Sequence, residues 1–360
     1  MSQKKRKKID SFKTSNPAQP ILHPRNSQDP LYSFTLDNFR DIVWGKRTTK
    51  FRKKRMPTEQ LVKKLKCKLR VKSDLIRCLM AEFIGTFVLV ALVDGGGAGV
   101  ITSRLSGLEN YLWLSFGSGF GVGFGIWTAY GISGGHVNPA VTLGLTMTGK
   151  FPWRRVPFYF LAQLCGAFCA CVVCFLVYFD GINNIDGGTR IAVDHPNATC
   201  GIFTTFPAAY VSLSTGFFEQ IVNTGIMLGL IHVIGDMRNA GPPFNLAPLF
   251  YGLIVFSVIL SYGTNAGAPL NPARDFAGRL MCAIAGYGPK VWAPYGVQWW
   301  WIPTFGPLVG AAVGSLVYLF LIEIHHPPEE KCPKDDFGEL VEDITNKTQN
   351  GGASAEEVKV

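Results

Sequence analysis

Residues 135–142 read GHVNPAVT, and residues 268–275 read APLNPARD. The two stretches share an Asn-Pro-Ala triplet, at 138–140 and again at 271–273, 133 residues further along the chain. Each triplet has the chemistry of a helix start, because Asn is a favoured N-cap and Pro is favoured at the first helical position. One such triplet carries almost no information, whereas two in matched surroundings indicate an internal repeat.

Apolar stretches of the length that a bilayer requires, about 20 residues, surround both triplets. There are six of them: 78–100, 110–131, 156–179, 217–235, 245–263 and 299–323. In the second, glycines fall on alternate residues from Gly117 to Gly125. An open strand cannot lie in lipid with its backbone unpaired, so we interpret this stretch as a tightly packed helix. The sequence therefore predicts an all-α membrane protein with six transmembrane helices.

The two halves of the chain carry matching acids. Glu82 lies in the first stretch and Glu219 in the fourth, each upstream of its own Asn-Pro-Ala triplet, and we expect these two to be the interior acids of the spans. Each half has three spans. Since three is odd, the halves insert with opposite topology, which is an inverted repeat with its functional segments near the midplane.

Charge is distributed very unevenly along the 360 residues. The net charge of +10 comes from +16 over residues 1–77, −1 over 78–324 and −5 over 325–360. A charge-poor body excludes a nucleic-acid-binding domain and disfavours a soluble enzyme. The Lys/Arg bias predicts that both termini are cytoplasmic.

Four of the nine cysteines cluster between Cys165 and Cys174 in no zinc-binding spacing, so we expect no metal and no cofactor.

The triplets predict two half-helices, over 139–149 and 272–282, each too short to span alone. Entering from opposite faces, they would meet by their N-termini at the midplane. Their dipoles would then disfavour a cation or proton there, and the amides of Asn138 and Asn271 would donate to a neutral oxygen. A water held in this way points its hydrogens outward, which breaks a proton-conducting chain. This chemistry favours neutral hydroxylic solutes over ions.

The residues before each half-helix are small and glycine-rich, which suits an extended backbone whose carbonyls line a path. We predict that Glu82 and Glu219 accept hydrogen bonds from amides of these loops. A proton or ion relay through the two acids is the alternative.

The sequence resembles the aquaporin (major intrinsic protein) family over residues 78–324, and its aquaglyceroporin branch in particular. The resemblance rests on SGGHVNPAVT at 133–142, NPARDF at 271–276, GIF at 201–203, GFFEQ at 216–220 and WWWIP at 299–303. Asp275 directly after Arg274 is a mark of that branch. The resemblance implies a homotetramer with a pore in each protomer. It also implies pore motifs at Asn138, Pro139, Ala140, Asn271, Pro272 and Ala273.

The same resemblance places a selectivity filter at Ser118, Ile259, Ala268 and Arg274, with Arg274 donating to solute hydroxyls. Glycerol channels usually have aromatic residues among these positions, and here none is aromatic. We expect a wide constriction, with Phe120 or Trp127 as aromatic residues that could also reach the lumen. A structural ion pair of Arg274 with Asp275 is the alternative. The remaining implied residues are pore-lining backbone at Gly134, Gly135, His136 and Gly267, and support by Glu82, Glu219 and Asp275.

The predicted channel domain, 78–324, consists of the halves 78–180 and 217–324 and of an extracellular loop, 181–216, between them. This loop contains a glycosylation sequon at Asn197. A second sequon, at Asn346, falls in the acidic tail 325–360 and is expected to be unmodified. The basic tail 1–77 is expected to be largely disordered, with an amphipathic helix over 58–72. That helix fits a surface of anionic lipid, a calmodulin-type target or simple positive-inside anchoring.

The sequence therefore predicts a passive, non-enzymatic channel for glycerol and water, with urea as a further candidate solute, in a multi-pass membrane protein of the plasma membrane. No nucleic acid is expected as a partner. The alternatives are a water-dominant channel, a secondary transporter, and a non-conducting junction protein. A transporter needs coupling acids at the midplane beyond Glu82 and Glu219, and we expect none.

Overall fold

The computed structural model describes residues 57–105, 107–239 and 241–327. The chain divides into two compact units, residues 1–70 and 71–360. In the first unit the described element is α2 (Pro57–Leu69), so the helix predicted over 58–72 ends at Leu69. Its side chains Leu61, Leu65 and Leu69 are exposed. The acidic tail beyond residue 327, with the sequon at Asn346, lies outside the described residues.

All regular structure among the described residues of the second unit is helical. The first half contains α3 (Asp74–Thr102), α4 (Gly107–Ser133), α5 (Pro139–Met147) and α6 (Val156–Val177). The second half contains α8 (Leu213–Gly235), α9 (Ala247–Ala266), α10 (Pro272–Ile284) and α11 (Trp301–Leu321). A short helix, α7 (Phe179–Asp186), opens the segment between the halves, and single 3-10 turns lie at 153–155, 200–202, 244–246, 289–291, 294–296 and 323–325.

Five of the described helices are long and apolar enough to cross a membrane: α3, α6, α8, α9 and α11. The second predicted span, 110–131, lies in α4, which has 27 residues. Its many glycines make it less hydropathic than these five helices, and it packs against α3 and α9 as the remaining span.

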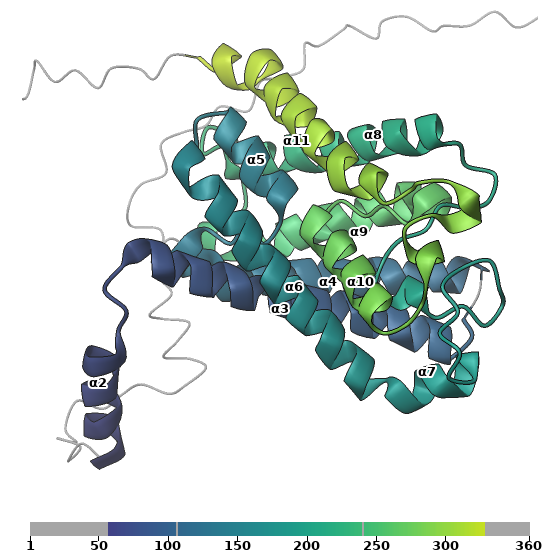
Figure 1. Cartoon of the computed structure of the whole chain (residues 1–360). Coiled ribbons are helices and arrows are strands. Elements are labelled where there is room, and N and C mark those ends of the chain that lie inside the picture. Colours follow the sequence, from purple (N-terminus) through teal and green to yellow (C-terminus); the bar gives the residue numbers. More distant parts are fainter. Residues whose placement is uncertain (1–56, 106, 240, 328–360) are drawn as a thin grey trace, which may run out of the picture. The chain divides into compact units, whose positions relative to one another are not determined.

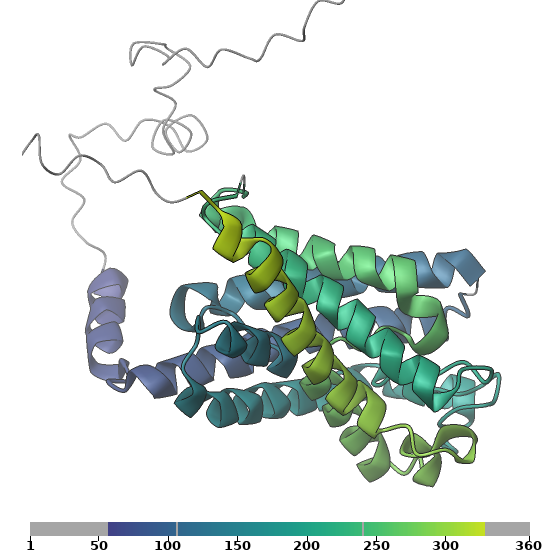
Figure 2. The ribbon, with the colours of Figure 1, turned by 90° about the horizontal axis from the view of Figure 1, so that it is seen from above.

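The helices of the two halves pack in matching pairs, and each half-helix contacts a helix of the other half (Figures 1 and 2). In each half the first and last helices pack together, α3 on α6 and α8 on α11. The middle helices α4 and α9 pack against each other across the halves. Each half-helix contacts the last helix of the other half, α5 on α11 and α10 on α6. This is the arrangement of an inverted repeat.

The glycines of α4 permit close helix packing. A Cβ at Gly119 would come 2.7 Å from Phe256 Cβ on α9, and a Cβ at Gly125 would come 2.7 Å from the carbonyl oxygen of Gly85 on α3. Real Cβ atoms do not approach other atoms so closely. The alternating glycines of 117–125 therefore lie in a helix held tightly between two neighbours, as the sequence predicts.

Both half-helices start as their triplets predict. The side-chain oxygen of Asn138 accepts from the Ala140 amide, and that of Asn271 accepts from the amides of Ala273 and Arg274. In each helix a Pro occupies the first turn. With 9 and 13 residues, α5 and α10 are about 14 and 20 Å long, so neither crosses a ~30 Å hydrocarbon layer alone.

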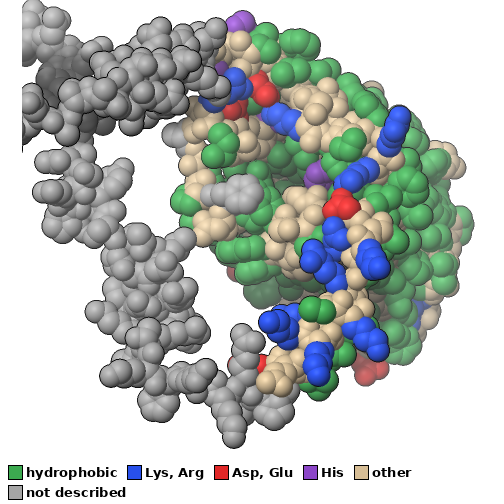
Figure 3. Space-filling model, turned by 90° about the vertical axis from the view of Figure 1, so that its left-hand side faces the viewer, with side chains coloured by type: hydrophobic (Ala, Val, Ile, Leu, Met, Phe, Trp, Pro, Cys, Tyr) green, Lys and Arg blue, Asp and Glu red, His purple; other side chains and the backbone are tan. Residues whose placement is uncertain are grey.

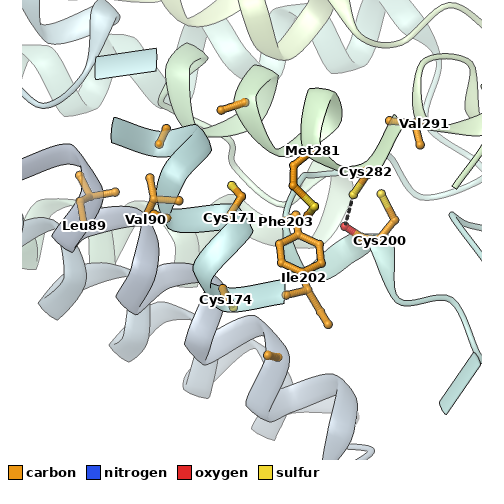
Figure 4. Close-up of a cluster of buried hydrophobic side chains, with 14 of the residues drawn as sticks. Leu89, Val90, Cys171, Cys174, Cys200, Ile202, Phe203, Met281, Cys282 and Val291 are labelled. Carbon is orange, nitrogen blue, oxygen red and sulfur yellow. Dashed lines mark hydrogen bonds between the residues drawn. The ribbon is translucent and has the colours of Figure 1, made fainter. Parts of the chain in front are cut away.

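A buried apolar cluster joins α3, α6 and the segment 200–203 to α10 (Figure 4). Leu89 and Val90 enter it from α3, and Ile202 and Phe203 from the turn after residue 200. Four free cysteines, Cys171, Cys174, Cys200 and Cys282, are buried in it. Small apolar side chains of this kind fill the space between closely packed helices.

Charged side chains gather at the end of the unit where α3 begins and α11 ends (Figure 3). Asp74 pairs with Arg155 at 3.0 Å, and Lys150 pairs with Glu323 at 2.8 Å. Apolar side chains cover the flank beside this face in the same view. An apolar flank with a charged end is the surface expected of a bilayer-spanning bundle.

Candidate functional site

A cavity of about 380 Å³ lies between α3, α4, α8 and α9. The loops before α5 and α10 also line it, and so does the segment 204–208. Eight of the residues singled out from the sequence line this cavity: Ser118, His136, Asn138, Ile259, Gly267, Ala268, Asn271 and Arg274. Gly134 and Gly135, which precede His136, are not among the lining residues. The cavity thus collects residues that are far apart in the sequence.

The two Asn side chains are held in a reciprocal arrangement. Asn138 Nδ2 donates to the carbonyl oxygen of Leu270, and Asn271 Nδ2 donates to that of Val137, both at 3.0 Å. Each side-chain oxygen is occupied by its own helix start. An amide nitrogen carries two hydrogens, so each Asn retains one N–H on the cavity wall. The N-termini of α5 and α10 therefore meet with one donor from each.

The two residues before the Asn side chains have a left-handed backbone. Val137 has φ +47° and Leu270 has φ +54°. For residues other than glycine this conformation costs about 1–3 kcal/mol each. It allows each carbonyl to accept the opposite Asn amide, so the strain is compensated by the bonds between the loops.

Glu82 supports the first loop from within α3. Its Oε1 accepts from Ser133 Oγ at 2.6 Å and from the His136 amide at 2.9 Å. Its Oε2 accepts from the Val137 amide at 2.7 Å and from Gln163 Nε2 at 2.8 Å. All four positions of the carboxylate are thus occupied, and the buried loop amides have an acceptor.

Glu219 does not reproduce this arrangement in the second half. Its Oε1 accepts a hydrogen bond from Asn223 Nδ2 at 3.4 Å, one turn along the same helix. Asn265 and Ala266, at the end of α9, are its other polar neighbours. The acids occupy matching places, but the set of short bonds to loop amides is present only around Glu82.

The four filter positions predicted from the sequence lie together on the cavity wall, and all are buried. Phe120 and Trp127 are not on that wall; both are about half exposed on the outer face of α4. Aromatic side chains instead reach the cavity from other places, which the sequence did not indicate: Tyr111, Tyr251 and Phe206.

Arg274 pairs with Asp94, a second acid within the first predicted span. Its Nη2 lies 3.4 Å from Oδ1 of Asp94, which is fully buried in α3. The expectation that Glu82 is the interior acid of the first span is therefore incomplete, because Asp94 lies within it as well. Nε and Nη1 of Arg274 have no hydrogen-bond partner among the described residues.

Asp275 is not the partner of Arg274. Its carboxylate accepts from Arg279 Nε at 2.8 Å and from both the amide and the hydroxyl of Thr205, at 2.9 and 2.6 Å. The Arg279 guanidinium also donates to the carbonyls of Val291 and Thr205, and it lies over the ring of Phe206. This buried pair therefore fixes the segment that brings Thr205 and Phe206 to the cavity.

The ring of His136 is packed and hydrogen-bonded. Nδ1 lies 3.1 Å from Thr142 Oγ1, and the ring contacts Phe151 and Tyr159.

In the outer segment, Thr199 of the first sequon is fully buried, and its hydroxyl donates to Asp186 at 2.9 Å. The sequon is thus part of the fold, with Asn197 half-buried beside it.

Comparisons with known proteins agree with this geometry. The family model of the major intrinsic protein matches residues 69–318. Human aquaporin-9 is 41% identical over 277 residues, covering 77% of this chain and 93% of the relative. Human aquaporin-10 is 41% identical over 267 residues, covering 74% and 88%. The X-ray structure of the aquaglyceroporin from Plasmodium falciparum has a TM-score of 0.61 and 33% identity, covering 68% of this chain and 95% of that chain. The chain belongs to the major intrinsic protein family.

Proposed function

We propose that the protein is a passive, bidirectional channel for glycerol, water and other small uncharged solutes, with protons and ions excluded. The observation that carries the proposal is the pair Asn138 and Asn271, each with one N–H on the cavity wall where the two half-helices meet. Relatives named as aquaporins and an aquaglyceroporin support it. The protein is not an enzyme.

Proton exclusion follows from two features of this junction. The N-termini of α5 and α10 both present partial positive charge, which disfavours a cation. The two Asn donors also orient a passing oxygen as an acceptor, so its hydrogens point away along the path. A chain of waters then has no continuous set of donors through which a proton could move.

The filter residues favour solutes that carry several hydroxyl groups. We assign Arg274 Nε and Nη1 as donors to solute oxygens, because neither has a partner among the described residues. Ser118 adds a hydroxyl, whereas Ala268 leaves room for a solute wider than water. Tyr111 and Phe206 offer apolar surface for the carbon chain of glycerol. This width favours glycerol and urea over a water-dominant channel.

The remaining assignments complete the proposal. We expect a homotetramer in the plasma membrane, with both termini cytoplasmic and the segment 181–216 outside, where Asn197 is available to glycosylation enzymes during synthesis. The proposed domains are 1–77, 78–324 and 325–360.

The exposed leucines and the lysines of α2 fit an anionic lipid surface. Deletion of 1–57 with neutralised α2 lysines should weaken liposome binding; unchanged binding contradicts the lipid contact.

The test of function is stopped-flow light scattering of proteoliposomes in glycerol, urea and water gradients. Glycerol and urea should enter faster than in empty vesicles without any ion gradient. Flux that requires an ion gradient would indicate a secondary transporter, and no flux of any solute would indicate a non-conducting protein. Water flux without glycerol flux would indicate a water-dominant channel.

A further inference from the structure

Asp94 is a buried acid beside the conducting cavity. It is fully buried in α3, and its neighbours Val93 and Gly97 lie on the cavity wall. Its Oδ1 is 3.4 Å from Nη2 of Arg274, which lines the cavity from α10. The pair joins residues 180 positions apart in the sequence. The acid and the cation thus meet at the wall of the path that a solute takes.

The charge of Arg274 has no other carboxylate partner among the described residues. The adjacent Asp275 accepts from Arg279 and Thr205. Without Asp94, Arg274 would be an isolated cation in a region of low dielectric constant, where a charge acts over a longer distance than in water. Such a cation attracts anions of a size that fits the cavity.

The guanidinium of Arg274 has two relevant properties, its positive charge and its hydrogen-bond donors, and different atoms of the group are involved in each. Nη2 faces Asp94, while Nε and Nη1 have no hydrogen-bond partner among the described residues. The group therefore retains donors for a solute oxygen while the neighbouring carboxylate offsets its charge. A neutral solute loses nothing by this offset, but an anion loses the attraction that would draw it into the cavity.

We propose that Asp94 is a specificity-determining residue: its carboxylate compensates the charge of Arg274, so that the cavity accepts neutral solutes and rejects small anions. The inference rests on the proposed channel function. A purely structural role, in which Asp94 only fastens α3 to α10, predicts a change in stability without a change in anion flux.

The test compares nitrate with urea, two planar solutes of similar size that differ in charge. Purified wild type, D94N, and D94N/R274Q are placed in vesicles that contain a dye quenched by nitrate, with valinomycin and potassium to balance charge. Urea and water fluxes are measured in parallel by light scattering. The control is D186N, which neutralises another buried Asp paired with an Arg, at 3.1 Å from Arg190 and away from the cavity wall.

For wild type and D186N, we expect nitrate entry at the level of empty vesicles. In D94N the ratio of nitrate to urea permeability should rise about tenfold or more, equivalent to about 1.4 kcal/mol. In D94N/R274Q nitrate entry should fall back to the empty-vesicle level, because the cation is gone. The proposal is overturned if D94N conducts water but no nitrate, or if nitrate entry persists in D94N/R274Q.

A folding defect is also informative. If D94N conducts no water, D94S replaces it, since the smaller side chain leaves room for a water beside Arg274. Loss of water flux in both D94N and D94S overturns the proposal, because this is the result expected when Asp94 serves only the stability of the fold. Absence of neutral-solute flux in the wild type contradicts the proposed function instead, and nitrate entry in D94N is still compared with D94N/R274Q.

Discussion

Glu82 Oε2 accepts a hydrogen bond of 2.7 Å from the backbone amide of Val137, 55 residues away. The bond holds the residue before Asn138 in its left-handed conformation, with φ +47°. The carbonyl of the same residue accepts the amide of Asn271 at 3.0 Å. One carboxylate in α3 therefore determines where both Asn donors lie.

Glu82→Gln should destabilise the channel and lower its water permeability. An amide has one acceptor oxygen, so its NH₂ group must face other donors, such as the Val137 amide of the loop or Gln163 Nε2 of α6. Buried donors that lose the carboxylate as their acceptor lower the free energy of unfolding by about 3 kcal/mol. The measurement is thermal unfolding in detergent with stopped-flow water flux. Glu219→Gln is the control, and we expect a smaller effect because the bond from Asn223 to Glu219 is long, at 3.4 Å; equal effects would contradict the asymmetry.

Asn138→Asp should allow protons to leak. A carboxylate cannot donate to the Leu270 carbonyl, which now receives a 3.0 Å bond from Asn138. It also places negative charge where two helix N-termini present positive charge. Proton entry into vesicles, followed with an internal pH dye after a pH jump, should rise about tenfold. Asn184→Asp, in the exposed part of α7, is the matched control. A proton flux equal to that of the control would refute the role of the Asn pair.

Local chemistry predicted the parts of the site that depend on neighbouring residues. The Asn-Pro starts of α5 and α10 are such parts, since the cap and the first turn lie within three residues of each other. Asp94 also lies within the first apolar stretch, 78–100, so the sequence marks it as an intramembrane acid beside Glu82. Its partner could not be predicted, because Arg274 is 180 residues away in the sequence.

The sequence also does not predict which aromatic side chains line the cavity. A helix that is apolar on all sides does not reveal which side faces the lumen, so Phe120 and Trp127 were plausible candidates although they lie on the outer face. Phe206 reaches the wall only because the segment around it is fastened to Asp275 and Arg279. Such placement follows from tertiary contacts between distant segments.

Ser118→Phe should narrow the filter. Ser118 lies on the cavity wall with Ile259, Ala268 and Arg274, and it is buried in α4. An aromatic ring at this position would fill space that glycerol and urea need, whereas water requires less. We expect glycerol and urea permeability to fall about tenfold while water permeability is largely retained. Phe120→Leu, two residues along on the outer face, should leave all three fluxes unchanged. An equal loss of water and glycerol would indicate misfolding rather than narrowing.

Asp236→Asn should weaken the junction between the end of α8 and α11. The Asp236 carboxylate accepts from Arg238 Nε at 3.1 Å and from Tyr318 Oη at 3.0 Å. These bonds, that from Arg238 above all, hold the pKa of Asp236 well below its usual value. A folded-state pKa below the unfolded one contributes stability above the unfolded pKa, and this contribution is lost as the pH falls through the folded pKa.

The difference in melting temperature between wild type and Asp236→Asn should therefore shrink as the pH falls below about 4. Thermal unfolding in detergent across this range gives the measurement. Asp180→Asn, at an exposed position of α7, provides the control. A difference that grows as the pH falls below about 4 would show that the sign of the pKa shift is wrong.

Gly125→Ala should disrupt the contact between α4 and α3. A Cβ at Gly125 would lie 2.7 Å from the Gly85 carbonyl oxygen and 2.7 Å from Leu89 Cβ, so the two helices must separate. Overpacking of this kind costs about 1–3 kcal/mol, and it moves Leu89 on the cavity wall. We expect a lower melting temperature together with reduced glycerol flux.

The control is on the same helix. Gly131 is exposed, and nothing lies within 4 Å of a Cβ built there. Alanine is a better helix former than glycine by about 1 kcal/mol, so Gly131→Ala should raise the melting temperature slightly and leave the flux unchanged. Both variants make the same chemical change. If the melting temperature falls in Gly125→Ala and rises in Gly131→Ala, the difference between the two changes therefore reports the cost of disturbing the contact between α4 and α3. Equal shifts would mean that the glycines of α4 are not required for its packing.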